Sequence, residues 1–197
     1  MNPPEKVTCF DIAMTTRFRR ITRRQGLLWR GTAGWAEWSP FLDYAGDELK
    51  PWLAAAVEAG EVGYPVPVRD SVPVNCTVPA VAPDRAHAIA AASGCRTAKV
   101  KVAEPGQTLA DDIARVETVR DAVGQEGKVR VDANGAWDHD EAVRALRRLA
   151  RFDLEYAEQP VDTVEGLARL RRDLVRQGIG VPIAADESIR RSGDPER

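Results

Sequence analysis

From Val72 onward the sequence alternates short apolar segments with amphipathic ones, and this alternation limits the fold more than any other feature. Segments with the length of buried strands are 72–80, 97–102, 129–134, 154–160 and 181–188. Segments with helical periodicity are 84–93, 108–123, 138–150 and 163–175. Because parallel strands need long crossovers, usually helices, the pattern predicts an α/β fold with a parallel sheet, either doubly wound or closed into a barrel.

Two of these helices carry sequence signals at their starts. Asp138 precedes Glu141 by three residues, and Asp162 precedes Glu165 by the same interval. An acceptor at the N-cap with Glu three residues later is typical of a capping box. We therefore expect both helices to begin at these aspartates.

The first 70 residues have a different pattern. Trp29, Trp35 and Trp38 lie close together, in a stretch with glycines at possible turns. This stretch predicts two or three antiparallel strands, followed by a helix over 46–60. A proline-rich segment, 63–75, then leads into the alternating region. We expect two domains, an α+β domain over 1–70 and an α/β domain over 71–197.

Composition excludes several classes of protein. Hydrophobic residues make up 44% and charged residues 29%, which is ordinary for a folded globular chain. The net charge of -2 gives no global field for nucleic acid or a membrane surface, so neither is expected as a partner. The start shows no signal-peptide pattern, and Cys9, Cys76 and Cys95 are widely spaced. These features favour a reducing cytoplasm, and a monomer is expected, although the sequence does not decide the oligomeric state.

Three expected strands end on a carboxylate. Asp132, Glu158 and Asp186 are separated from one another by about one strand–helix unit. Carboxyl ends of successive parallel strands meet at one edge of a sheet, so we expect the three acids at the same level. Their mutual repulsion is relieved by a hard divalent cation, and Mg²⁺ with its preference for oxygen ligands fits. The alternative is that each acid only caps the helix that follows it.

The segment 97–102 carries Lys99 and Lys101 on one face and apolar residues on the other. Two adjacent lysines inside a barrel, near a metal, are expected to have depressed pKa values, which suits a general acid or base. The alternative is an exposed edge strand with solvated lysines. Further strand–helix units on both sides of this segment make an edge position hard to reconcile with the pattern.

These motifs resemble a known family. The sequences "KVK", "DANGAW", "EQP" and "DES" on successive strands are similar to those of the muconate-lactonising branch of the enolase superfamily. The resemblance implies an N-terminal α+β capping domain and an enolase-type TIM barrel, incomplete here because the sequence stops at Arg197 after the fifth strand. It implies that a lysine removes a proton next to a carboxylate while Mg²⁺ holds the enolate.

The resemblance also implies roles for individual residues. Lys101 would be the acid/base, and Lys99 would tune and orient it. The metal ligands would be Asp132, Glu158 and Asp186. Asn134 and Ser188 share the faces of Asp132 and Asp186, so we expect them to bind a small carboxylate substrate.

Within this branch, residues 10–41 resemble the o-succinylbenzoate synthases, which are dehydratases of menaquinone biosynthesis. N-succinylamino acid racemases and dipeptide epimerases use the same proton abstraction, so these residues leave them open. The family carries another lysine on a sixth strand, which this sequence does not contain. A non-catalytic fragment is the third alternative, and we expect the 197 residues alone to be inactive and prone to aggregate.

Overall fold

The computed structural model describes residues 6–18 and 21–192, and the chain divides into two compact units, Met1–Val72 and Pro73–Arg197. The first unit contains a three-stranded antiparallel sheet in the order β1-β2-β3. Its strands are β1 (Val7–Phe18), β2 (Ile21–Arg30) and β3 (Trp35–Trp38). A short 3₁₀ turn, η1 (Gly46–Glu48), leads into helix α1 (Leu49–Glu61). These elements confirm the predicted antiparallel strands and the helix after them.

A small apolar core joins the sheet of the first unit to α1. Trp29, Ala36 and Ala56 are its buried members. Gly60 lies against Ala36, and a Cβ on Gly60 would come within 3.0 Å of the Ala36 side chain. A larger residue at position 60 would therefore require the helix or the sheet to shift by a few tenths of an ångström.

The second unit is a five-stranded parallel sheet in the order β4-β5-β6-β7-β8. Its strands are β4 (Cys76–Val78), β5 (Thr97–Lys101), β6 (Lys128–Asp132), β7 (Leu154–Glu158) and β8 (Ile183–Ala184). Its helices are α2 (Pro83–Ala92), α3 (Leu109–Val123), α4 (His139–Leu149), α5 (Val164–Arg176) and α6 (Glu187–Ser192), with a 3₁₀ turn η2 (Ala150–Phe152) after α4. The predicted parallel sheet with helical crossovers is confirmed.

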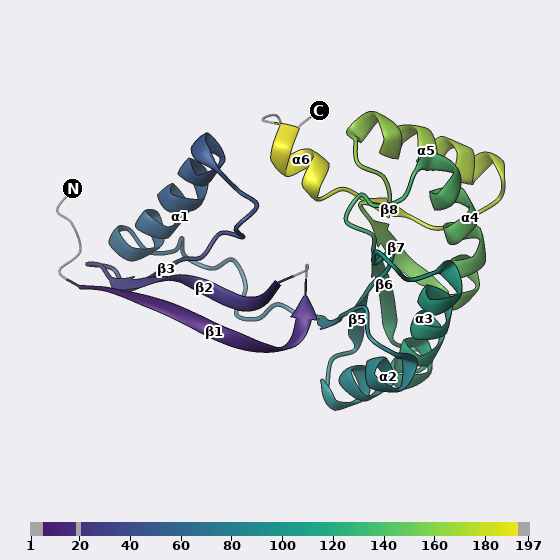
Figure 1. Ribbon diagram of the computed structural model, residues 1–197, viewed down its shortest axis with the longest axis horizontal. Coiled ribbons are helices and arrows are strands. Elements are labelled where there is room, and N and C mark those ends of the chain that lie inside the picture. Colours follow the sequence, from purple (N-terminus) through teal and green to yellow (C-terminus); the bar gives the residue numbers. More distant parts are fainter. Residues whose placement is uncertain (1–5, 19–20, 193–197) are drawn as a thin grey trace. The chain divides into compact units, whose positions relative to one another are not determined.

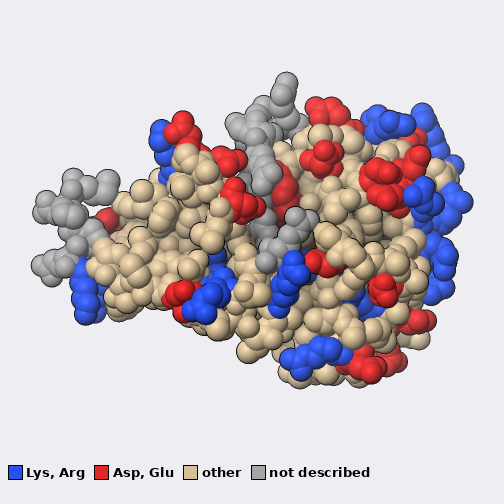
Figure 2. Space-filling view, viewed as in Figure 1, with Lys and Arg blue, Asp and Glu red and all other residues tan. Residues whose placement is uncertain are grey.

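Helices α2 to α5 lie along one face of this sheet (Figure 1). Val100, Val129 and Val131 point toward the helices and are almost fully buried, in one core cluster with helix residues such as Leu146 and Leu170. The polar faces of these helices point outward, where basic and acidic side chains are interspersed (Figure 2). Because side chains alternate along a strand, the residues between the valines point to the opposite face of the sheet.

The helix starts are partly as predicted. Asp138 and Glu141 form the expected capping box at α4. The prediction for Asp162 is wrong, because the N-cap of α5 is Thr163, whose hydroxyl accepts the Gly166 N–H at 3.0 Å. Two residues able to cap stand side by side, and the extended backbone of Thr163 decides between them.

None of the described helices is long and apolar enough to cross a bilayer. All three cysteines lie in the described ranges, and each has a free thiol.

The choice of cap at α5 can be tested by removing each acceptor in turn. Thr163→Ala should lower the free energy of unfolding by about 1 kcal/mol, because an N-terminal N–H of α5 loses its acceptor. Asp162→Ala should change it by less than about 0.5 kcal/mol, as most exposed surface substitutions do. Urea denaturation of the gene product that carries this sequence measures both, and a larger loss for Asp162→Ala would contradict the structure.

Candidate active site

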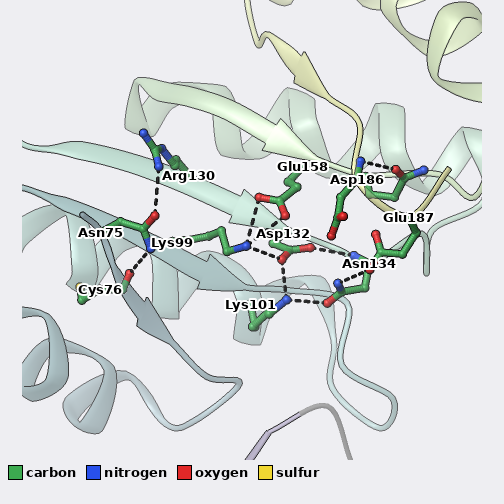
Figure 3. Close-up of polar contacts among 11 residues, drawn as sticks. Asn75, Cys76, Lys99, Lys101, Arg130, Asp132, Asn134, Glu158, Asp186 and Glu187 are labelled. Carbon is green, nitrogen blue, oxygen red and sulfur yellow. Dashed lines mark hydrogen bonds and ion pairs between the residues drawn. The ribbon is translucent and has the colours of Figure 1, made fainter. Parts of the chain in front are cut away.

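A row of charged residues crosses the sheet at the ends of three strands. In the parallel ladders, Lys101 of β5 is the partner of Asp132 of β6, and Asp132 is the partner of Glu158 of β7. Lys99 lies two residues before Lys101 on the same face of β5. Figure 3 shows these four side chains pointing toward one another. The structure thus brings together the two predicted lysines and two of the three predicted carboxylates.

Lys99 lies between the two carboxylates. Its Nζ is 3.1 Å from Asp132 Oδ2 and 3.0 Å from Glu158 Oε1. Lys101 forms an ion pair with the same Asp132 carboxylate and donates to Asn134 Oδ1 at 2.7 Å. Asp132 is almost fully buried, with 1% of its side chain exposed, so both ammonium groups offset the loss of its hydration.

Strand β5 is not an exposed edge. It lies between β4 and β6, and the side chains of Lys99 and Lys101 are mostly buried, 22% and 12% exposed. The alternative of solvated edge lysines is therefore wrong. Helices of the second unit cover β5 on one face of the sheet, and the carboxylates of Asp132 and Glu158 neutralise its lysines on the other.

The pKa of Lys99 is raised, whereas the sequence led us to expect a depressed value for a lysine beside a bound cation. Burial lowers the pKa of the ammonium, but the charges and hydrogen bonds of Asp132 and Glu158 outweigh burial. The pKa of the Glu158 carboxyl is also raised, first by burial and then by the negative charge of Asp132, while Lys99 opposes both. The sequence showed the lysine pair but not that two carboxylates would contact one of its members.

Asp186 does not lie at the level that the sequence predicted. Glu158 is the ladder partner of Ala184, where β8 ends, so Asp186 lies two residues beyond the row. The chain then enters α6 at Glu187. The negative charge of Asp186 nevertheless acts on Glu158 and raises the pKa of that carboxyl. Asp186 is therefore near the row, although it is held by contacts other than the sheet ladder.

The two residues expected to bind substrate make contacts within the protein. Asn134 Nδ2 donates to Glu187 Oε1 at 2.8 Å, while its Oδ1 accepts from Lys101 (Figure 3). The Ser188 hydroxyl donates to Gln159 Oε1 at 3.1 Å. Asn134 thus orients the Lys101 ammonium, and a role in substrate binding stays a prediction for both residues.

The donor set of this edge fits a hard divalent cation. Asp132 and Glu158 already converge on one cationic group, the Lys99 ammonium, and Asp186 adds a third nearby carboxylate. Oxygen ligands of this kind suit Mg²⁺. Within the described ranges, no group of three or more His, Cys, Asp or Glu side chains is arranged as a finished metal site.

A buried ion pair that the sequence analysis missed fixes the loop after β5. Arg115 is 1% exposed and donates to the carbonyl oxygens of Lys101 at 2.9 Å and Val81 at 2.8 Å. It pairs with Asp112 at 2.9 Å, and Asp112 accepts the Ala103 N–H at 3.0 Å. Burial raises the pKa of Asp112 despite these hydrogen bonds. The sequence contained a signal for this ion pair, because Asp112 and Arg115 are oppositely charged residues on the face of α3 that is expected to be apolar.

Family models match both units. Residues 82–196 match the model described as enolase C-terminal domain-like, and residues 9–60 match the one described as enolase N-terminal domain-like. Among curated proteins, o-succinylbenzoate synthase of Thermobifida fusca (strain YX) is 61% identical over 95% of this chain. The o-succinylbenzoate synthase of Mycolicibacterium smegmatis is 50% identical over 98% of it. This chain spans 58% of the length of each of these two relatives.

Solved structures share the fold at low sequence identity. The L-Ala-D/L-Glu epimerase of Bacillus subtilis is 23% identical, with a TM-score of 0.68, over 92% of this chain and 67% of that one. The o-succinylbenzoate synthase of Thermosynechococcus elongatus BP-1, complexed with magnesium, is 20% identical, with a TM-score of 0.56, over 92% and 68%. At such identities the similarity establishes a common fold, here a capping domain and part of an α/β barrel.

The contacts of Lys99 predict an effect on stability. Lys99→Met keeps the length of the side chain but leaves the Asp132 and Glu158 carboxylates without their shared ammonium. The free energy of unfolding should fall by about 1 to 3 kcal/mol, the typical cost of an uncompensated buried polar group. Added magnesium should reverse part of the loss. Urea denaturation tests this, with Lys128→Met on the exposed start of β6 as control, and equal stabilities of the two variants would contradict the prediction.

Proposed function

Since this chain belongs to the enolase superfamily, we propose that it supplies the capping unit, the acid/base lysine and the metal ligands of an o-succinylbenzoate synthase. The reaction is the dehydration of 2-succinyl-6-hydroxy-2,4-cyclohexadiene-1-carboxylate to o-succinylbenzoate in menaquinone biosynthesis. The identities of 61% and 50% to the two curated synthases support this choice of reaction. The substrate is accordingly a small carboxylate.

The observation that carries the proposal is the row formed by Lys101, Asp132 and Glu158. It joins a primary amine to paired carboxylates at the carboxyl edge of a parallel sheet, where active sites of α/β barrels are built. Asp132, Glu158 and Asp186 would hold Mg²⁺. When bound, the cation supplies positive charge against the substrate oxygens on which negative charge develops.

The lysine carries the proton through both halves of the reaction. Lys101, as the neutral amine, takes the proton from the ring carbon that bears the carboxylate, and the electron pair of that C–H bond passes into the enolate. The enolate then expels the hydroxyl group from the neighbouring ring carbon. The Lys101 ammonium returns its proton to that group, so water leaves and the ring becomes aromatic. Asn134, which accepts from Lys101 at 2.7 Å, orients the Nζ during these transfers.

Two other functions use the same first step. Racemisation of N-succinylamino acids and epimerisation of dipeptides also begin with removal of a proton next to a carboxyl or amide carbonyl group. The assay of the gene product therefore includes an N-succinylamino acid and a dipeptide beside the cyclohexadiene. Turnover of either alone would contradict the synthase proposal, and turnover of none would favour a non-catalytic protein.

We also propose that the protein acts in the cytoplasm. The three free thiols, with no disulfide among the cysteines, support this location because such thiols persist in a reducing compartment.

Removal of the proposed acid/base should abolish most of the turnover. Lys101→Ala should reduce kcat by about 10² to 10⁴-fold, the usual contribution of general acid–base catalysis. Lys128→Ala, on the exposed start of β6, is the matched control and should leave kcat unchanged. Stopped assays of o-succinylbenzoate formation, with circular dichroism to verify folding, measure the effect. Near-normal turnover of folded Lys101→Ala would show that another group is the base.

The proposed metal requirement is tested by chelation. Exhaustive treatment with EDTA should abolish turnover, and added magnesium should restore it. Glu158→Gln should raise the magnesium concentration needed for half-maximal activity by at least about 10-fold, because a charged oxygen ligand is lost. Glu165→Gln, an exposed substitution in the first turn of α5, should not change it. Full activity after chelation would remove the metal from the proposal.

A further inference from the structure

Gln159 is a completely buried polar residue directly after Glu158, with 0% of its surface exposed. Its Oε1 accepts the N–H of Asp186 at 2.8 Å, and both the N–H of Ser188 at 3.2 Å and its hydroxyl at 3.1 Å. Its Nε2 donates to the Val161 carbonyl at 2.7 Å. The amide group therefore connects the end of β7 with the segment that follows β8.

The backbone of Gln159 adds hydrogen bonds to β8 on one side and to the segment after β6 on the other. Its N–H donates to the Ala184 carbonyl at 2.8 Å, and its carbonyl accepts the Gly135 N–H at 2.6 Å. Its φ of 40° lies in the left-handed region, which a residue other than glycine occupies only when surrounding contacts compensate the strain. One residue thus ties together the segments that follow three adjacent strands, β6, β7 and β8.

These contacts matter because Asp186 lies outside the sheet ladder. Strand β8 ends at Ala184, so no strand pairing fixes the carboxylate two residues later. The amide oxygen of Gln159 holds the Asp186 backbone instead. A primary amide suits this position because it accepts and donates at the same time, which a methionine of similar size cannot do.

We propose that Gln159 is a positioning residue that sets the place of the Asp186 carboxylate relative to Glu158. This proposal rests on the proposed function, in which both carboxylates bind the same cation. Gln159 does not touch the cation itself. It fixes Asp186 before a cation binds. Because the segment is already ordered, cation binding does not have to reduce its conformational entropy.

Two substitutions separate the hydrogen bonds of Gln159 from its volume. Gln159→Met fills a similar space without polar atoms, while Gln159→Glu retains an acceptor for the N–H groups of Asp186 and Ser188. Hydrogen–deuterium exchange without metal should be at least about 10-fold faster in segment 184–189 for Gln159→Met, because both amides lose their acceptor. Gln159→Glu should remain closer to the wild type.

Calorimetric titration with magnesium gives the second readout. Gln159→Met should weaken magnesium binding by about 10- to 100-fold, the range typical for residues that orient metal ligands. Gln159→Glu should weaken it less. Leu170→Ala removes a fully buried side chain from α5 and is the control, since it destabilises the fold but leaves the hydrogen bonds of Gln159 to Asp186 and Ser188 in place. It should leave magnesium affinity unchanged.

The outcomes distinguish this proposal from the proposed function. Unchanged exchange or unchanged magnesium affinity in folded Gln159→Met would overturn the positioning role, as would an equal loss of affinity in Leu170→Ala. If the wild type binds magnesium but does not form o-succinylbenzoate, the choice of reaction fails while the comparison of Gln159 variants still stands. If the wild type binds no magnesium, the positioning role for the metal site is overturned with it.

Discussion

The contact of one ammonium, that of Lys99, with carboxylates on two neighbouring strands constrains the whole second unit. Charges withdrawn from water are tolerated only where opposite charges and hydrogen bonds replace hydration. Asp132 and Glu158 meet this condition because the strand ladders of β5, β6 and β7, after a register shift near the start of the β6–β7 pair, bring Lys101, Asp132 and Glu158 level. A slip of one residue would turn the carboxylates toward the helices and the apolar side chains toward the charged edge. The register is therefore set by the fold and required by the chemistry at the same time.

The two faces of the sheet differ in their side chains, and the stability of the apolar face allows the burial of the charged one. The face toward α2 to α5 buries valines and leucines, which supplies the hydrophobic stabilisation of this unit (Figure 1). The opposite face carries charges whose burial is costly. Two buried polar residues stabilise the loops where these faces meet the carboxyl edge. Arg115 binds the carbonyl of Lys101 and the segment after β4, and Gln159 binds the segment after β8. Rigid loops of this kind keep the charged groups in place while the core holds the strands.

Prediction from sequence succeeded where one local pattern dominated and failed where two competed. Strand and helix positions followed from periodicity, and the capping box at Asp138 followed from its spacing to Glu141. At α5 the same spacing misled, because Thr163 beside Asp162 is also a good cap. The level of Asp186 was misjudged since the apolar run continues to Ala185 although strand pairing stops at Ala184. The raised pKa of Lys99 was not foreseen, because the sequence indicated burial but not the convergence of two carboxylates on one ammonium.

The sequence by itself determined the parallel sheet, its helical crossovers, and the placement of Lys101, Asp132 and Glu158 at the carboxyl ends of successive strands. It could do so because strand alternation and unit length are local properties of the chain. Only the tertiary structure decided which atoms meet: Lys99 between two acids, Arg115 on the carbonyl of Lys101, and Gln159 on the amide of Asp186. Such contacts join residues far apart in the chain, and their geometry depends on the packing of whole strands and loops. No pattern within a single segment records that packing.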